Sequence, residues 1–218
     1  ELPFPVVGMS DNMPYESTKY SDMDRPMIGK FIRVFKEKIR IAIKESRPDI
    51  IYSHHLWLTT AIVSELAGDI PVVAFSHGTD IRQLRKNFLE EEYILKNIRS
   101  LEKIYALTEY QKEEIYKTYS IGNKEDIEVI GAGFDSEIFF LDTEFRRSQA
   151  ENTLKIVYAG KICKTKGTDL LVRAYNRVSL KAEIATKLFI IGNGEDKELI
   201  QNEVGKANKT VEFYDSIS

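Results

Sequence analysis

The stretch LKIVYAGKICKTKGTDLLVRAYNRV, residues 154–178, decides the fold of this 218-residue chain. Residues 154–159 are mainly apolar and have the length of a buried strand, whereas residues 168–178 carry the pattern of a helix. Between them lies a loop with a glycine at each end and three lysines, from Gly160 to Gly167. A strand that leads through a short loop into a helix is the repeating unit of a parallel α/β sheet. We therefore expect this part of the chain to belong to an α/β domain.

The same alternation continues on both sides of this unit. Towards the C-terminus it predicts a strand at 187–191, a helix at 195–207 and a strand at 211–214. Towards the N-terminus it predicts a helix at 27–46, a strand at 50–53, a helix at 56–66, a strand at 71–75, a helix from about residue 90, a strand at 104–107, a helix from residue 108 and a strand at 127–130. Such alternation is typical of parallel sheets that helices cover on both faces.

A charged and polar stretch interrupts the alternation, and we expect residues 142–152 to form a linker between two domains. The prediction is an α/β chain of two Rossmann-like domains with parallel sheets, residues 1–141 and 153–218. The second alternation stops after three strands, too few for a complete doubly wound sheet, and the first residue is Glu rather than Met. We therefore expect the first domain to lack its start and the second to lack its end.

Composition excludes several classes of protein. The chain is 43% hydrophobic and 30% charged with a net charge of −3, so it lacks the basic excess of a nucleic-acid-binding protein. No stretch reaches the roughly 18 to 20 apolar residues of a membrane span. The single cysteine, Cys163, precludes an internal disulfide and fits a reducing compartment. These features predict a cytoplasmic protein that binds no nucleic acid.

Ligands of parallel sheets bind beyond the carboxyl ends of the strands, where the Gly160–Gly167 loop lies. Its glycines permit tight turns, the following helix offers free N–H groups, and its lysines add positive charge. This combination suits a diphosphate, and the alternative is a solvated lysine loop. The spacing is not that of a Walker loop, because no Gly-Lys-Ser/Thr follows four residues after a first glycine.

Two further segments follow predicted strands. Gly192-Asn193-Gly194 comes after the strand at 187–191, where missing side chains would let the backbone approach a ligand, although an ordinary turn explains it as well. His77 comes after the strand at 71–75 and precedes Gly78. An imidazole in this position can hydrogen-bond a sugar hydroxyl or transfer a proton, and the alternative is a structural histidine that caps the loop.

These three segments, in this order, resemble motifs of the group 1 (family 4) retaining glycosyltransferases, which have the GT-B fold. The segments Pro48–Ile51 and Ile70–Val73 match strands of that family's first domain, and His77 begins a matching His-Gly-Thr-Asp. Val129 to Asp135, which includes Gly133, lies where the family has its interdomain turn. The resemblance covers the chain from about residue 47 onward.

The resemblance implies a hexosyl- or other glycosyltransferase, of the kind that serves polysaccharide biosynthesis. The donor would be a nucleotide-diphosphate sugar, the acceptor an unidentified glycan, lipid or small molecule, and the reaction would proceed with retention and without a cofactor or an obligatory metal. The first domain would receive the acceptor and the second the donor. The residues implied are His77 as the catalytic contact to the transferred sugar, Gly160, Lys161, Lys166 and Gly167 at the donor diphosphate, Gly192 and Gly194 at the nucleotide, and Gly133 and Asp135 in the interdomain turn.

The sequence departs from the family pattern at several points. Lys161 replaces the usual arginine and exchanges a bidentate fork for a point charge, and Ala132 replaces the usual asparagine of the interdomain turn. The paired glutamates of the family would lie beyond Ser218 and its N-terminal glycine-rich loop before Glu1, so we expect this fragment by itself to be inactive. Two other functions stay open: a nucleotide-sugar epimerase of the same fold and a non-catalytic module that binds nucleotide sugars.

Two patterns mimic metal sites. Asp22-Met23-Asp24 looks like the Asp-x-Asp clamp for a divalent ion, but it follows no predicted strand and a turn explains it. His54 and His55 are adjacent in a predicted strand, so we expect their side chains to lie on opposite faces. We therefore predict no metal site.

Other patterns have structural explanations. Glu195 and Glu203 have the spacing of the family's glutamate pair but lie in the wrong place, and a solvated helix face explains them. The run 130–133 lacks the third glycine of a dinucleotide fingerprint. The first predicted helix carries four basic residues: Lys30, Arg33, Lys36 and Lys38. A solvated helix face is the first explanation for them, and peripheral contact with anionic lipid at the inner membrane face is the alternative.

Overall fold

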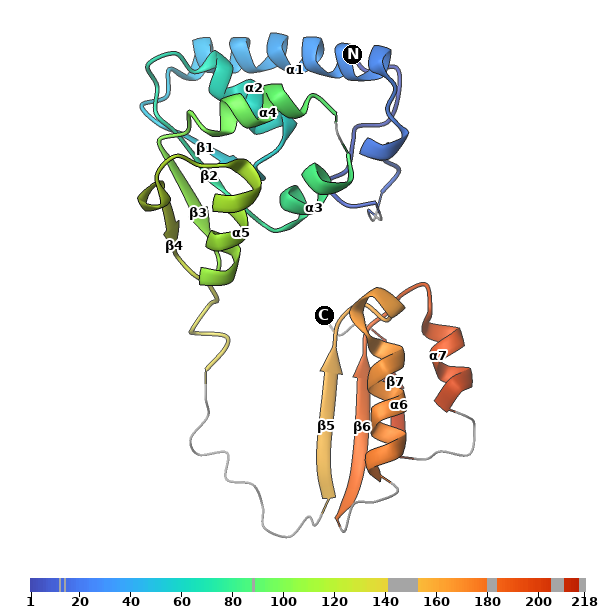
Figure 1. The fold of residues 1–218 in the computed structure, drawn as a ribbon. Helices are drawn as coiled ribbons and strands as arrows, with labels where there is room; N and C mark the ends of the chain where they lie inside the picture. Colours follow the sequence, from blue (N-terminus) through green and yellow to red (C-terminus); the bar gives the residue numbers. More distant parts are fainter. Residues whose placement is uncertain are drawn as a thin grey trace. The chain divides into compact units, whose positions relative to one another are not determined.

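Two parallel β-sheets, each with its own helices, make up the computed structural model (Figure 1). It describes residues 1–11, 13, 15–87, 89–140, 153–179, 184–204 and 210–215. The chain divides into two units, Glu1–Phe139 and Phe140–Ser218, and each is described by itself. The linker predicted at 142–152 lies outside the described residues.

The first sheet has four parallel strands in the order β1-β2-β3-β4. They are β1 (Ile51–His54), β2 (Val72–Phe75), β3 (Lys103–Ala106) and β4 (Ile127–Val129). The helical elements of this unit are η1 (Tyr20–Asp22), α1 (Arg25–Ser46), α2 (Leu58–Leu66), α3 (Thr79–Lys86), α4 (Glu91–Ile98), α5 (Glu109–Tyr119) and η2 (Lys124–Asp126). Every strand and helix predicted for this part of the chain is present, within a few residues at its ends.

Helix α3 is the α-helix that the sequence pattern did not predict. Its eight residues, TDIRQLRK, are mostly polar and offer only Ile81 and Leu84 as an apolar pair at helical spacing. Both of these side chains are buried, and so are Asp80 and Gln83. The helix is therefore held by buried polar groups, which a search for apolar periodicity does not detect.

Helices cover one face of the first sheet in the described residues. On that face Ala74, Ile104 and Ile127 pair across the strands and are buried. On the other face Tyr52 is 62% exposed, and its ring stacks on that of Phe75. Parallel strands in sequential order carry their helices on one side of the sheet when the crossovers are right-handed, as nearly all such crossovers are.

The core of the first unit lies between this sheet and its helices. Phe31 from α1, Ile62 from α2 and Ile94 from α4 are buried there, and α2 contacts both α1 and α4 (Figure 1). Asp24 is the N-cap of helix α1, and its carboxylate accepts a hydrogen bond from the backbone N–H of Met27 at 2.8 Å. The Asp-x-Asp pattern is thus explained by a helix cap. Among the described residues, none of the helices is both long enough and apolar enough to cross a membrane.

The second sheet has three parallel strands, β5 (Thr153–Ala159), β6 (Ala185–Ile191) and β7 (Val211–Tyr214), in that order. Its helical elements are η3 (Lys164–Lys166), α6 (Thr168–Ser179) and α7 (Lys197–Val204). The helix predicted at 195–207 begins two residues later than expected, and its predicted last residues lie outside the described residues. In the described part of this unit the core contains these buried side chains: Ile162, Val172, Tyr175, Leu188, Ile190, Ile200 and Val211.

Candidate functional site

All three histidines of the chain lie together at the carboxyl ends of β1 and β2. The Nδ1 atom of His54 is 2.9 Å from Nε2 of His77, and the ring centroids of His55 and His77 are 4.7 Å apart. His55 has a φ of 67°, in the left-handed region, so the chain turns sharply where the strand ends. That turn explains why the two adjacent histidines both contact His77, contrary to the expected separation on opposite faces.

Among the described residues, the histidine cluster lacks the geometry of a site with three or more metal ligands. Within the described parts of the chain, no group of three or more histidine, cysteine, aspartate or glutamate side chains could hold an ion. His54 and His77 are exposed, which leaves their imidazoles accessible to a ligand. The arrangement can donate and accept hydrogen bonds or move a proton, as expected for His77.

The buried carboxylate of Asp80 holds the loops that carry the histidines. It accepts hydrogen bonds from the backbone N–H of Leu56 at 2.8 Å, from the hydroxyl of Ser76 at 3.1 Å and from the backbone N–H of Ile81 at 3.0 Å. Leu56 follows β1 and Ser76 follows β2, so one side chain links the two strand ends. No role was predicted for Asp80, because the helix in whose first turn it lies, α3, was itself not predicted from the sequence.

Burial lowers the pKa of His55. The nearby Asp80 carboxylate acts in the opposite direction, and His77 and His54 lower the pKa further. His55 is therefore neutral near pH 7, and its Nδ1 lies 3.3 Å from the hydroxyl of Thr79.

We expect the free energy of unfolding of the first unit to decrease as the pH falls from about 7 to about 5. The pKa of His55 is lower in the folded state than the ordinary value of about 6.5, so the unfolded chain takes up this proton first. Urea unfolding followed by fluorescence of Trp57, the single tryptophan, measures the effect. Replacing His55 by Asn, which tolerates a left-handed conformation, should flatten the pH dependence. The same slope in both proteins would contradict this assignment.

In the second unit the predicted diphosphate loop follows β5 and leads through η3 into α6 (Figure 1). Gly167 ends η3 with a φ of 74°, a conformation that favours glycine. The Nζ atom of Lys161 is 2.9 Å from a carboxylate oxygen of Glu195, and both side chains are about half exposed. The lysine is thus paired with a carboxylate of the same chain, which would compete with a bound phosphate group for the ammonium.

Gly192 and Gly194 pack the turn after β6 against this loop. A Cβ on Gly192 would overlap the carbonyl oxygen of Gly160, and one on Gly194 would overlap that of Ile162, each well below the 3.0 Å that real Cβ atoms keep. The backbone N–H of Ile162 donates to the carbonyl of Asn193 at 3.0 Å. The glycines therefore have a structural role, as the alternative of an ordinary turn implied, and this role extends to close packing against the neighbouring loop. Their contact with a nucleotide stays a prediction.

Gly133 and Asp135 lie in the exposed segment after β4. The side chain of Asp135 accepts a hydrogen bond from the backbone N–H of Glu137 at 2.9 Å, and its carbonyl accepts one from Phe139 at 2.8 Å. A turn is therefore present at the expected place, and its interdomain role stays a prediction. No helix occurs in the described residues 130–140, so the helix that a dinucleotide fingerprint requires is missing there.

The glutamate pair and Lys36, one of the four basic residues of α1, have local partners. Glu195 binds Lys161, and Glu203 binds Arg173 at 2.7 Å on α6. Lys36 binds Glu65 at 2.6 Å and lies over the ring of Tyr93. These contacts agree with solvated helix faces that are stabilised by surface ion pairs.

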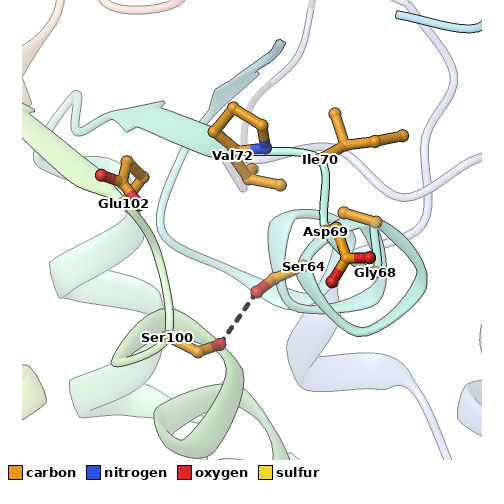
Figure 2. A pocket seen from close by; sticks show the side chains of 9 residues that line it. Ser64, Gly68, Asp69, Ile70, Val72, Ser100 and Glu102 are labelled. Carbon is orange, nitrogen blue, oxygen red and sulfur yellow. Dashed lines mark hydrogen bonds between the residues drawn. The ribbon is translucent and has the colours of Figure 1, made fainter. Parts of the chain in front are cut away.

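Figure 2 shows a pocket of about 240 Å³ at the opposite, amino-terminal edge of the first sheet. Ser64 and Ser100, whose hydroxyl oxygens are 3.0 Å apart, line this pocket together with Asp69 and Glu102. Ligands of parallel sheets bind at the carboxyl ends of the strands, so this pocket is not the candidate site.

Several solved structures are similar to this one. The apo form of the lipopolysaccharide outer core galactosyltransferase WaaB matches with a TM-score of 0.60 and 18% identity, over 86% of this chain and 49% of that one. A UDP-forming α,α-trehalose-phosphate synthase from Burkholderia xenovorans matches with a TM-score of 0.60 and 16% identity, over 90% and 55%. Anabaena HepE in complex with UDP and glucose matches with a TM-score of 0.55 and 15% identity, over 88% and 52%. The search of curated protein sequences gave no match.

The chain spans about half the length of these proteins. At such low identity the similarities establish the fold, which is the GT-B type with two Rossmann-like α/β units. The profile of Glycosyltransferase Family 4 matches residues 15–138, more than half of the chain. This protein therefore belongs to glycosyltransferase family 4.

Proposed function

We propose that this chain is part of a glycosyltransferase that transfers a sugar from a nucleotide-diphosphate sugar to an acceptor. The observation that carries the proposal is the Gly160–Gly167 loop, whose backbone is hydrogen-bonded to the turn after β6 at the carboxyl ends of two adjacent strands. Membership of family 4 supports a transferase. The similar HepE structure contains UDP and glucose, which supports a nucleotide sugar as the donor.

Lysine side chains would supply the chemistry at the donor. Lys161 would leave Glu195 and pair with the diphosphate, and Lys166 would add a second positive charge on the same loop. Their charges would stabilise the nucleotide diphosphate as it departs from the sugar. We further propose that His77 contacts the transferred sugar and that the reaction proceeds with retention and without a metal. The acceptor, a cytoplasmic location and peripheral contact with a membrane stay predictions.

We expect UDP or GDP to bind this chain, and to bind a Lys161→Ala, Lys166→Ala variant at least about 10-fold more weakly. Each lost hydrogen bond to a charged phosphate is worth about 1.5–3 kcal/mol. Isothermal titration calorimetry with each nucleotide measures the difference and identifies the preferred base.

Two single variants control for charge. Lys187→Ala removes a lysine that pairs with Glu212 on the sheet, away from the loop, and should leave the affinity unchanged. Glu195→Gln frees Lys161 from its exposed partner and should strengthen binding a few-fold, in line with a surface ion pair of about 1 kcal/mol or less.

Equal affinities of the unaltered chain and the double variant would refute the assignment of the diphosphate to this loop. Conversion of a UDP-sugar without acceptor would instead indicate an epimerase.

A further inference from the structure

His54 and His77 form a hydrogen-bonded pair that the sequence did not suggest. Their nitrogen atoms, Nδ1 of His54 and Nε2 of His77, are 2.9 Å apart. A neutral imidazole has one N–H and one lone pair, so one ring must donate here and the other must accept. The geometry therefore couples the protonation of the two rings.

The hydrogen bond requires the two neutral rings to have the same tautomer. If Nδ1–H of His54 donates, then Nε2 of His77 accepts and the proton of His77 is on Nδ1. If Nε2–H of His77 donates, then His54 carries its proton on Nε2. In both cases the two neutral rings have the same tautomer, and their outward nitrogens present one donor and one acceptor.

The surroundings hold the His54 ring in place. Its ring lies 5.2 Å from that of Phe75 at an interplanar angle of 23°, and Phe75 in turn stacks on Tyr105 at 4.8 Å. Asp80 links the loops that follow β1 and β2, as described above. The distance between the two imidazoles therefore depends on packing and on a buried carboxylate.

Several charged or titratable groups lie near the pair or in the same row of the sheet. His55 lies against His77 from the loop after β1, and Asp80 lies at the start of α3. Tyr52 and Tyr105 stack on Phe75, and Glu128 follows Tyr105 in the same row of the sheet. Asp80 is the buried negative charge among them, and its carboxylate accepts hydrogen bonds from Leu56, Ser76 and Ile81.

We propose that His54 is a positioning residue for His77, so that the two imidazoles act as one unit with one outward donor and one outward acceptor. A sugar hydroxyl both donates and accepts a hydrogen bond, and such a unit complements it. This role in sugar transfer rests on the proposed function, whereas the hydrogen bond and the matched tautomers do not. The pair can take up one proton and keep its hydrogen bond. A second added proton would break it, because both facing nitrogens would then carry N–H and neither could accept.

Nuclear magnetic resonance of the chain labelled with ¹⁵N-histidine tests the pair directly. The chain has three histidines, so single replacements assign all imidazole signals. At about pH 8.5, above the ordinary imidazole pKa of about 6.5, we expect His54 and His77 to show the same tautomer. We also expect a ¹⁵N–¹⁵N coupling between Nδ1 of His54 and Nε2 of His77 across the hydrogen bond.

His54→Phe keeps an aromatic ring on Phe75 and should abolish the coupling and change the His77 signals. His55→Asn removes the third imidazole and should leave both features of the pair unchanged. Opposite tautomers of His54 and His77 in the unaltered chain, or no coupling between them, would overturn the proposal even if a variant failed to fold. Because no ligand is present, the result is independent of the nucleotide titration that tests the proposed function.

Discussion

Asp80→Ala should lower the free energy of unfolding of the first unit by about 4 kcal/mol. The carboxylate is fully buried and accepts hydrogen bonds from Leu56, Ser76 and Ile81. Each buried donor that loses its acceptor costs about 1–3 kcal/mol, and removal of the buried charge offsets part of the sum. Because Asp80 links the ends of β1 and β2, the same replacement should also weaken the hydrogen bond between His54 and His77.

Urea unfolding followed by Trp57 fluorescence measures this loss, since the single tryptophan is buried in the first unit. The matched control is Asp69→Ala, an exposed aspartate in the same unit, which should change the stability by no more than about 0.5 kcal/mol. Asp80→Asn keeps one carbonyl oxygen as an acceptor and should give an intermediate loss. A similar small effect of Asp80→Ala and Asp69→Ala would show that the carboxylate does not hold the two loops.

Gly192→Ala should destabilise the second unit by roughly 4 kcal/mol and abolish nucleotide binding with it. The new methyl group would overlap the carbonyl oxygen of Gly160, and the φ of 138° is unfavourable for any side chain. Overpacking against backbone costs about 1–3 kcal/mol, and a strained left-handed conformation adds about as much. The turn after β6 would therefore separate from the predicted diphosphate loop.

The buried thiol of Cys163 reports on this unit, because it is the single cysteine of the chain. Its reaction with a thiol reagent should become faster in Gly192→Ala, while the unfolding of the first unit measured by Trp57 stays unchanged. Gly167→Ala is the matched control, since its φ of 74° is strained but no atom lies within 4 Å of the added Cβ. We expect it to cost only about 1 kcal/mol. Equal thiol reactivity in the two variants would mean that overlap with Gly160 does not decide the stability.

Much of the candidate site followed from local sequence. His77 and the Gly160–Gly167 loop each come directly after a strand, and strand ends can be read from apolar runs bounded by glycine. The contacts between segments could not be predicted in this way. The pairing of Lys161 with Glu195, and of His54 with His77, joins residues more than 20 positions apart, and nothing in either segment alone specifies its partner.

The sequence by itself determined the alternation of strands and helices and the parallel α/β class, because hydrophobic periodicity and glycine turns are local properties. It also placed the lysine loop and His77 at the ends of strands. Only the tertiary structure decided which face of the first sheet the helices cover, since that depends on strand order and crossover handedness. Only the tertiary structure showed that the three histidines lie together near Asp80, and only it explained why residue 192 is a glycine. Both features depend on the distance between neighbouring strand ends across the sheet.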